Sequence, residues 1–136
     1  MKHAPPGYEC PFCGIAATLP ASYSRSAIVF ADANVFAMLP LHYYGGIKGN
    51  CLIVPRSHYE NLLEVPDSLG NDFFAATRRL AQAMLSAFGC QGISTRQHNA
   101  PAGDQDVWHY HHTFFLAIPA MGFMPGIRVC TPQRNG

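Results

Sequence analysis

The sequence has few charged residues, and they are not clustered. Only 12% of its 136 residues are charged, and the formal net charge is +1. No cluster of lysines and arginines occurs. This argues against a nucleic-acid partner, because proteins attract nucleic acid through basic patches. No apolar run approaches the length of a membrane span, and residues 1–7 lack the apolar core of a signal peptide. We therefore expect a cytoplasmic protein with neither a nucleic-acid nor a membrane partner.

The cysteines form an odd set of five without framework spacing, so we expect no structural disulfide. Cys10 and Cys13 stand apart as Cys-Pro-Phe-Cys. Thiolates at this spacing can occupy two corners of a tetrahedral zinc site that two imidazoles complete. The alternative is that these two reduced cysteines have no role. A redox pair is disfavoured, because no obvious helix start follows Cys10 to lower the pKa of its thiol.

The hydrophobic pattern predicts one α+β domain in which an antiparallel sheet packs with one long helix. Strands are expected at residues 26–30 and 35–39, joined as a hairpin, and at residues 51–54, 92–97 and 106–115. Between them, apolar residues recur at helical spacing from Asp67 or Ser68 to Gly89, a natural C-terminal stop. The expected divisions are a flexible N-terminus (1–9), the domain (10–115) and an atypical tail (116–136).

Two imidazoles at i, i+2 spacing mark the last expected strand. Because strand side chains alternate between faces, His109 and His111 should share a face and His112 should point the other way. Such a pair can hold a metal, orient a phosphate or supply a nucleophile. Taken alone, the pair is equally consistent with two half-buried histidines that bond to backbone carbonyls.

Several motifs occur in a specific order: Cys-x-x-Cys at 10–13, Leu-Ile-Val-Pro-x-x-His at 52–58, and Gln-x-Val-x-His-x-His at 105–111. In this order they resemble the histidine triad (HIT) family of nucleotide hydrolases and transferases. The resemblance implies that His111 attacks the α-phosphorus of a purine mononucleotide or dinucleotide substrate and forms a nucleotidyl-histidine. It assigns substrate contacts to Asn99, Gln105 and His109. It also implies a zinc site of Cys10, Cys13, His58 and His109, and a homodimer.

The chain departs from the family pattern directly after His111. The family continues His-x-His-x-His-Val-x-Pro-Arg, whereas this chain has Thr113 in the third histidine position and no Pro-Arg after it. His42 also stands where many relatives carry an acidic residue that binds ribose, and we expect it to be a loop histidine. The missing imidazole predicts impaired catalysis, because losing one transition-state donor costs on the order of a hundredfold or more.

The genetic code suggests how the C-terminal end diverged. Reading the back-translated segment from the third base of the His112 codon permits His, Val, Phe or Leu, Pro and Arg, and later Gly-Asp-Gly-Leu-Tyr-Ala. We hypothesise that one base was lost in the His-codon tract, so that residues 113–136 are out of frame. The gene sequence tests this: wobble bases that do not encode the expected continuation would refute it.

Three functions follow as alternatives. The first is a HIT-type hydrolase or transferase acting through His111, impaired at Thr113 and possessing a structural zinc. The second is a nucleotide-binding module without turnover. The third is a zinc-stabilised fold without a ligand.

Overall fold

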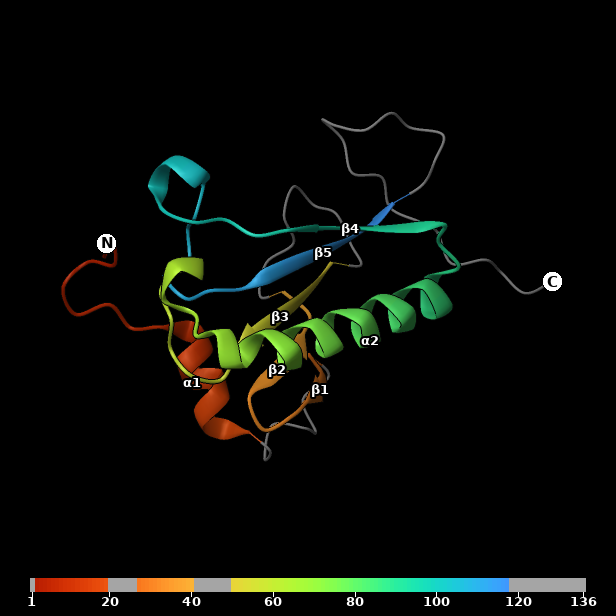
Figure 1. The fold of residues 1–136 in the computed structure, drawn as a ribbon, viewed down its shortest axis with the longest axis horizontal. Helices are drawn as coiled ribbons and strands as arrows, with labels where there is room; N and C mark the ends of the chain where they lie inside the picture. The colour runs from red at the N-terminus through yellow and green to blue at the C-terminus, as the bar shows by residue number, and fades with distance from the viewer. Residues whose placement is uncertain (1, 20–26, 41–49, 118–136) are drawn as a thin grey trace.

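The structure is a computed structural model that describes residues 2–19, 27–40 and 50–117. It contains two α-helices, α1 (Pro11–Thr18) and α2 (Gly70–Phe88), within this described part. The strands are β1 (Ile28–Ala31), β2 (Val35–Met38), β3 (Cys51–Pro55), β4 (Gly92–Arg96) and β5 (His112–Ala117). All are antiparallel, in the order β1-β2-β3-β5-β4. The predicted α+β class, with one long helix, is confirmed (Figure 1).

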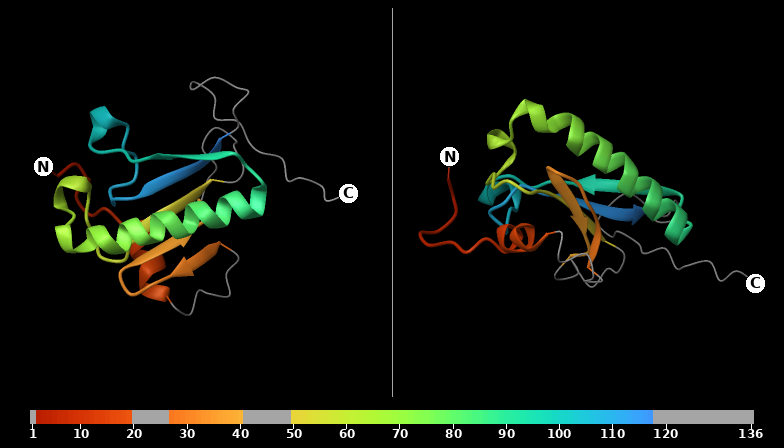
Figure 2. Two further views of the ribbon diagram at one scale, coloured as in Figure 1. Left: turned by 45° about the vertical axis from the view of Figure 1, so that its right-hand side comes forward. Right: turned by 90° about the horizontal axis from the view of Figure 1, so that it is seen from below.

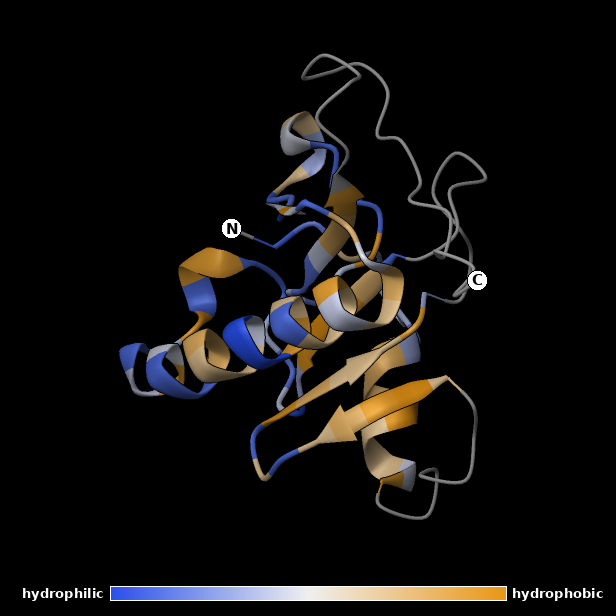
Figure 3. Cartoon of the chain, turned by 90° about the vertical axis from the view of Figure 1, so that its right-hand side faces the viewer, coloured by the Kyte–Doolittle hydropathy of each residue, from blue (hydrophilic) through white to orange (hydrophobic). Residues whose placement is uncertain are grey.

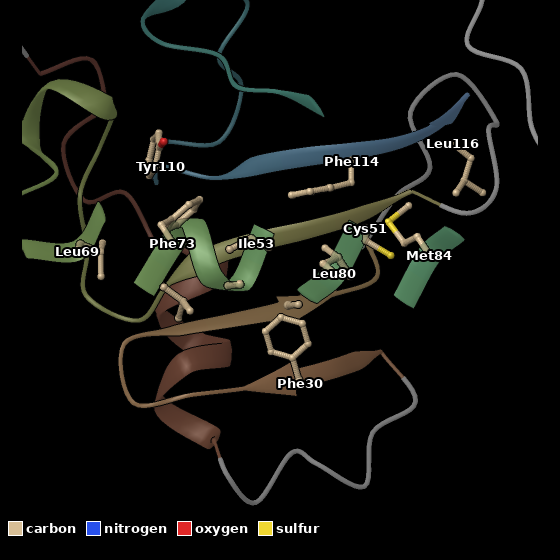
Figure 4. Close-up of a cluster of buried hydrophobic side chains, with 13 residues drawn as sticks. Phe30, Cys51, Ile53, Leu69, Phe73, Leu80, Met84, Tyr110, Phe114 and Leu116 are labelled. Carbon is tan, nitrogen blue, oxygen red and sulfur yellow. The ribbon is translucent and has the colours of Figure 1, made fainter. Parts of the chain in front are cut away.

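The sheet separates two apolar layers. Along β3, Cys51 and Ile53 join the cluster beneath α2, whereas Leu52 and Val54 join the cluster that includes Phe12 of α1. This alternation is the pleat of a strand buried on both faces. Figure 2 shows α2 across one face and α1 on the other side. In Figure 3 the strands are largely apolar, whereas α2 also carries polar residues. Figure 4 shows the α2-side core, where Phe73, Leu80 and Met84 face the sheet.

Helix α2 matches the predicted boundaries closely. A short 3₁₀ turn, Asp67–Leu69, leads into it, and Gly89 ends it with a φ of 64°. The left-handed conformation costs glycine little, and the Gly89 N–H donates to the Leu85 carbonyl. No helix among the described residues has both the length and the apolar character needed to cross a membrane.

The histidine segment differs from its prediction, because β5 begins at His112 rather than at Asp106. Local hydrogen bonds explain the difference. The His109 N–H donates to the Val107 carbonyl, and the Tyr110 N–H donates to the Tyr59 carbonyl, so neither amide is available for a strand ladder. The prediction that the His109 and His111 side chains lie on the same side of the sheet still holds. Both contact the Phe12 ring, whereas His112 contacts Phe73 of α2 on the other side.

Two predictions about the cysteines are wrong. A helix does start directly after Cys10, which is the N-cap of α1 and accepts a hydrogen bond from the Cys13 amide. Pro11 in the first helical turn is a recognised start signal that the sequence reading missed. Cys10, Cys13 and Cys51 are free thiols, but Cys90 is disulfide-bonded.

The segment before α1 contacts the body of the domain. Glu60, only 1% exposed, accepts hydrogen bonds from the backbone amides of His3 and Ala4. Lys2 forms an ion pair with Glu64. His42 and residues 118–136, to which the sequence assigned a loop role and an out-of-frame origin, lie outside the described residues.

Candidate active site and metal-binding cluster

Four side chains from three separate segments bring their ligand atoms together. Cys10 and Cys13 come from the start of α1, His58 follows β3, and His109 precedes β5. All four ligand atoms lie within 4.8 Å of one another. His109 Nδ1 is 3.2 Å from Cys10 Sγ and 3.2 Å from His58 Nδ1. Cys13 Sγ is 3.3 Å from His58 Nδ1 and 3.6 Å from His109 Nδ1.

These distances match the edges of a coordination tetrahedron. With metal–sulfur bonds of about 2.3 Å and metal–nitrogen bonds of about 2.05 Å, sulfur–nitrogen edges are about 3.6 Å and nitrogen–nitrogen edges about 3.3 Å. The four residues could therefore form a metal site, as the sequence predicted. The fit rests on the donor set, two soft thiolates and two imidazoles, which suits a four-coordinate ion.

The His109 ring is fixed in the form that a metal ligand needs. It is fully buried, and its Nε2 lies 2.9 Å from the Pro55 carbonyl oxygen. This bond assigns the ring proton to Nε2 and leaves the Nδ1 lone pair facing the two sulfurs. Burial lowers the pKa of His109 to about 4, so the ring is neutral near pH 7. Burial also raises the pKa of the Cys13 thiol to about 11, so ligation must displace its proton.

His111 is held in the complementary arrangement. Its Nδ1 lies 2.7 Å from the His109 carbonyl oxygen, which assigns the proton to Nδ1. The Nε2 lone pair is thereby left available, and the ring packs edge-on against Phe12 at 5.3 Å. Burial lowers the pKa of His111, which favours the neutral, nucleophilic form. One backbone carbonyl therefore connects His109, a candidate metal ligand, to the His111 ring.

A cavity of about 450 Å³ opens beside His111 on the α1 side of the sheet. Apolar walls come from Pro11, Phe12, Leu52, Val107 and Phe115. Its polar lining consists of Asn50, Arg96, His98, Asp104, Asp106, His111 and Thr113. Thr113, in the third histidine position, therefore faces the same space as His111. The cavity is large enough to hold a ligand and offers both stacking surfaces and hydrogen-bonding groups.

Two residues expected to contact substrate have their amides engaged elsewhere. Gln105 Nε2 donates to the carbonyls of Glu60 and Val107, and Gln105 Oε1 accepts from the Ala100 amide. Asn99 Oδ1 accepts from the Leu62 amide, and its Nδ2 donates to Gln97. Neither lines the cavity. His109 likewise lies in the metal-binding cluster rather than at the cavity wall.

Gln105 instead supports a strained loop. Ala100 has φ 64° and ψ 165°, a conformation that is normally restricted to glycine. The Ala100 amide donates to Gln105 Oε1 at 2.9 Å, and the Ala100 carbonyl accepts from the amides of Gly103 and Gln105. These bonds hold the strained residue in place and set the course of residues 98–106, which supply three polar side chains to the cavity.

The sequence reading missed Asn50 and Arg96 as cavity residues. A signal for Asn50 was present, because it directly precedes β3 and stands two residues before Leu52, in line with the same face of the strand. No comparable signal existed for Arg96, whose position depends on the pairing of β4 with β5.

Comparisons with known proteins agree with this architecture. The family model described as "HIT domain" matches residues 22–114. The protein named "Protein hit" of Bacillus subtilis is 35% identical over 104 residues, covering 76% of this chain and 67% of that protein. A crystal structure of a HIT family member from Bacillus subtilis has a TM-score of 0.70 at 29% identity, covering 89% of this chain and 84% of that one. A zinc-bound histidine triad protein from Mycobacterium smegmatis shares the fold, with a TM-score of 0.64 at 22% identity over 94% of this chain and 77% of that one.

Proposed function

We propose that this chain, which belongs to the histidine triad (HIT) family, acts at the α-phosphate of a nucleotide through His111. Family membership supports a nucleotide-binding hydrolase or transferase at a coarse level. The observation that carries the finer proposal is the tautomer of His111: Nδ1 is committed to the His109 carbonyl, while the ring lines the cavity. We expect a purine mononucleotide or dinucleotide as substrate.

His111 Nε2 would form a bond to phosphorus as the bond from phosphorus to the leaving group breaks. The electron pair of the broken bond goes to the leaving atom, and water then displaces His111 in a second step. Each of two displacements at phosphorus, through a covalent intermediate, has a lower barrier than one direct hydrolysis. The neutral imidazole needs no prior deprotonation, because its lowered pKa keeps the lone pair available near pH 7.

Stabilisation of the transition state is the weak part of the site. Gln105, the expected donor to the phosphate oxygens, uses its amide on backbone carbonyls. Thr113 offers one hydroxyl in place of an imidazole. We therefore propose slow turnover. The same observation favours a second candidate function, nucleotide binding without turnover.

We further propose that Cys10, Cys13, His58 and His109 hold a structural zinc ion. The donor set, the tetrahedral spacing and the zinc-bound relative from Mycobacterium smegmatis support this assignment. With four protein ligands the ion has no open position, so it would join the start of α1 to the two histidine loops and take no part in the reaction. We expect a homodimer in the cytoplasm, which light scattering and cell fractionation can test.

The nucleophile is tested with adenosine 5′-phosphoramidate. AMP release should be measured for the wild type, for His111→Asn and for His3→Asn, which removes a histidine outside the cavity. We expect slow release and a 5′-adenylyl adduct by intact mass in the wild type and the control only. Equal release by His111→Asn would exclude His111 as nucleophile. Binding without release in all three proteins would establish the second candidate function.

The zinc proposal is tested by elemental analysis of protein purified without added metal. We expect about one zinc per chain, lost together with part of the melting temperature in Cys10→Ser. Cys51→Ala, which changes a free cysteine outside the cluster, is the matched control and should retain the metal. Unchanged metal content in Cys10→Ser would show the assignment to be wrong.

A further inference from the structure

Asn50 has a buried carboxamide without a hydrogen-bond partner among the residues that the structure describes. The residue is 1% exposed, and within residues 2–19, 27–40 and 50–117 neither Nδ2 nor Oδ1 finds a partner. Leaving such a group unpaired is costly, and nearly all buried amides in proteins find partners. Asn50 lines the cavity beside His111. A ligand in that cavity would provide the missing partner.

Sheet register places two further donors beside Asn50. Arg96 of β4 pairs directly with Thr113 of β5, which pairs with Leu52 of β3. Directly paired residues share a face, and Asn50 shares the face of Leu52. The Arg96 guanidinium lies 5.7 Å from the centre of the Phe115 ring, and continuing the β3–β5 register sets Phe115 opposite Asn50. All three polar side chains line the same cavity.

This group, Asn50, Arg96 and Thr113, lines the same cavity as the proposed nucleophile, His111. Thr113 is two residues after His111 on the same side, a step of about 7 Å along an extended chain. In an in-line displacement the leaving group departs on the side of phosphorus opposite Nε2. We infer that a phosphate attached to the α-phosphorus occupies the part of the cavity that these donors line. The carboxylates of Asp104 and Asp106, on the loop that precedes His109, also line this cavity.

We propose that Asn50, Arg96 and Thr113 form a subsite for a leaving group that carries a phosphate. This inference rests on the proposed function and specifies the bond that is cleaved fastest, a phosphate anhydride. When His111 Nε2 bonds to phosphorus, the electron pair of the broken P–O bond goes to the leaving phosphate, which departs as an anion without taking up a proton. An amine leaving group must take up a proton. The Thr113 hydroxyl is a weak acid for this step, and the His98 proton is engaged at Nδ1 by the Gly103 carbonyl. An amine should therefore leave more slowly than a phosphate, in keeping with the slow release expected from adenosine 5′-phosphoramidate.

The subsite is tested by binding, independently of turnover. Titration calorimetry compares AMP with α,β-methylene-ADP, whose second phosphate cannot be cleaved off. We expect the wild type to bind the methylene analogue at least about tenfold more tightly, the gain expected for charge-assisted hydrogen bonds. Arg96→Met and Asn50→Leu should each reduce this ratio toward one while leaving AMP affinity largely unchanged. Arg78→Met, which removes a charge from α2 on the opposite face, should leave the ratio intact.

Stability measurements separate this result from misfolding. Asn50→Leu removes two unpaired buried atoms, so its melting temperature should equal or exceed that of the wild type. Three results would each overturn the subsite. They are equal wild-type affinities for the two nucleotides, an unchanged affinity ratio of α,β-methylene-ADP to AMP in both variants, and failure of both nucleotides to bind. If the ratio behaves as expected but His111 forms no adduct, the subsite stands and the hydrolase proposal fails.

Discussion

The affinity of the cysteine and histidine cluster for zinc should depend steeply on pH, and the structure sets the slope. Burial raises the pKa of the Cys13 thiol to about 11, so this thiol carries a proton throughout the range from pH 6 to 8. Binding of zinc must release that proton, so the apparent association constant rises tenfold per pH unit for this ligand alone. Burial lowers the pKa of His109 to about 4, so His109 releases no proton above pH 5 and adds nothing to the slope.

The expected result is therefore a rise of at least about a hundredfold between pH 6 and pH 8. Competition against a chromogenic chelator of known affinity, at constant ionic strength, measures it. Cys13→Ser should bind far more weakly and lose at least one unit of the slope. An association constant that stays flat from pH 6 to 8 would mean that Cys13 is not a ligand, or that its thiol is already ionised in the free protein.

Three further outcomes follow from single side chains. Thr113→His should raise AMP release from adenosine phosphoramidate by about a hundredfold, because it restores a transition-state donor; no increase would show that this position does not limit the rate. Burial lowers the pKa of His112 from 6.5 to about 4, so its contribution to stability is present above pH 6.5 and is lost as the pH falls toward 4. In urea unfolding without metal, the free energy of unfolding of the wild type should thus fall by about 3 kcal/mol more than that of His112→Phe between pH 7 and pH 4. Equal decreases in the two proteins would contradict this. Ala100→Gly should stabilise the protein by about 1 kcal/mol in the same assay, because glycine adopts φ 64° and ψ 165° without strain; destabilisation would contradict it.

Much of this architecture could be predicted because the apolar pattern and the capping residues agree. The β3 run is apolar on both faces and is central in the sheet, as its composition indicated. Gly89 ends α2 where the helical pattern ends. The start of α1 was missed because Cys10 is an uncommon N-cap, although Pro11 marked the position.

The interior of the site was less predictable, because it depends on pairing between distant segments. The family pattern indicated a substrate contact for Gln105, but the side chain satisfies a strained backbone at Ala100, and no sequence pattern shows that strain. Arg96 reaches the cavity only because β4 pairs with β5 in one particular register. A shift of one residue would turn its side chain to the α2 face.

The division of roles between His109 and His111 explains how threonine can stand in the third histidine position while the fold is preserved. His109 uses both ring nitrogens within the structure, Nε2 on Pro55 and Nδ1 toward the sulfurs, and its carbonyl fixes the His111 ring. None of these bonds involves a residue after His111. The apolar residues Phe114, Phe115 and Leu116 that follow Thr113 are buried and continue β5, so the pairing of β5 with β3 and β4 is retained. What changes is the hydrogen-bonding capacity at one cavity position, where a threonine hydroxyl replaces an imidazole beside an unpaired Asn50 carboxamide.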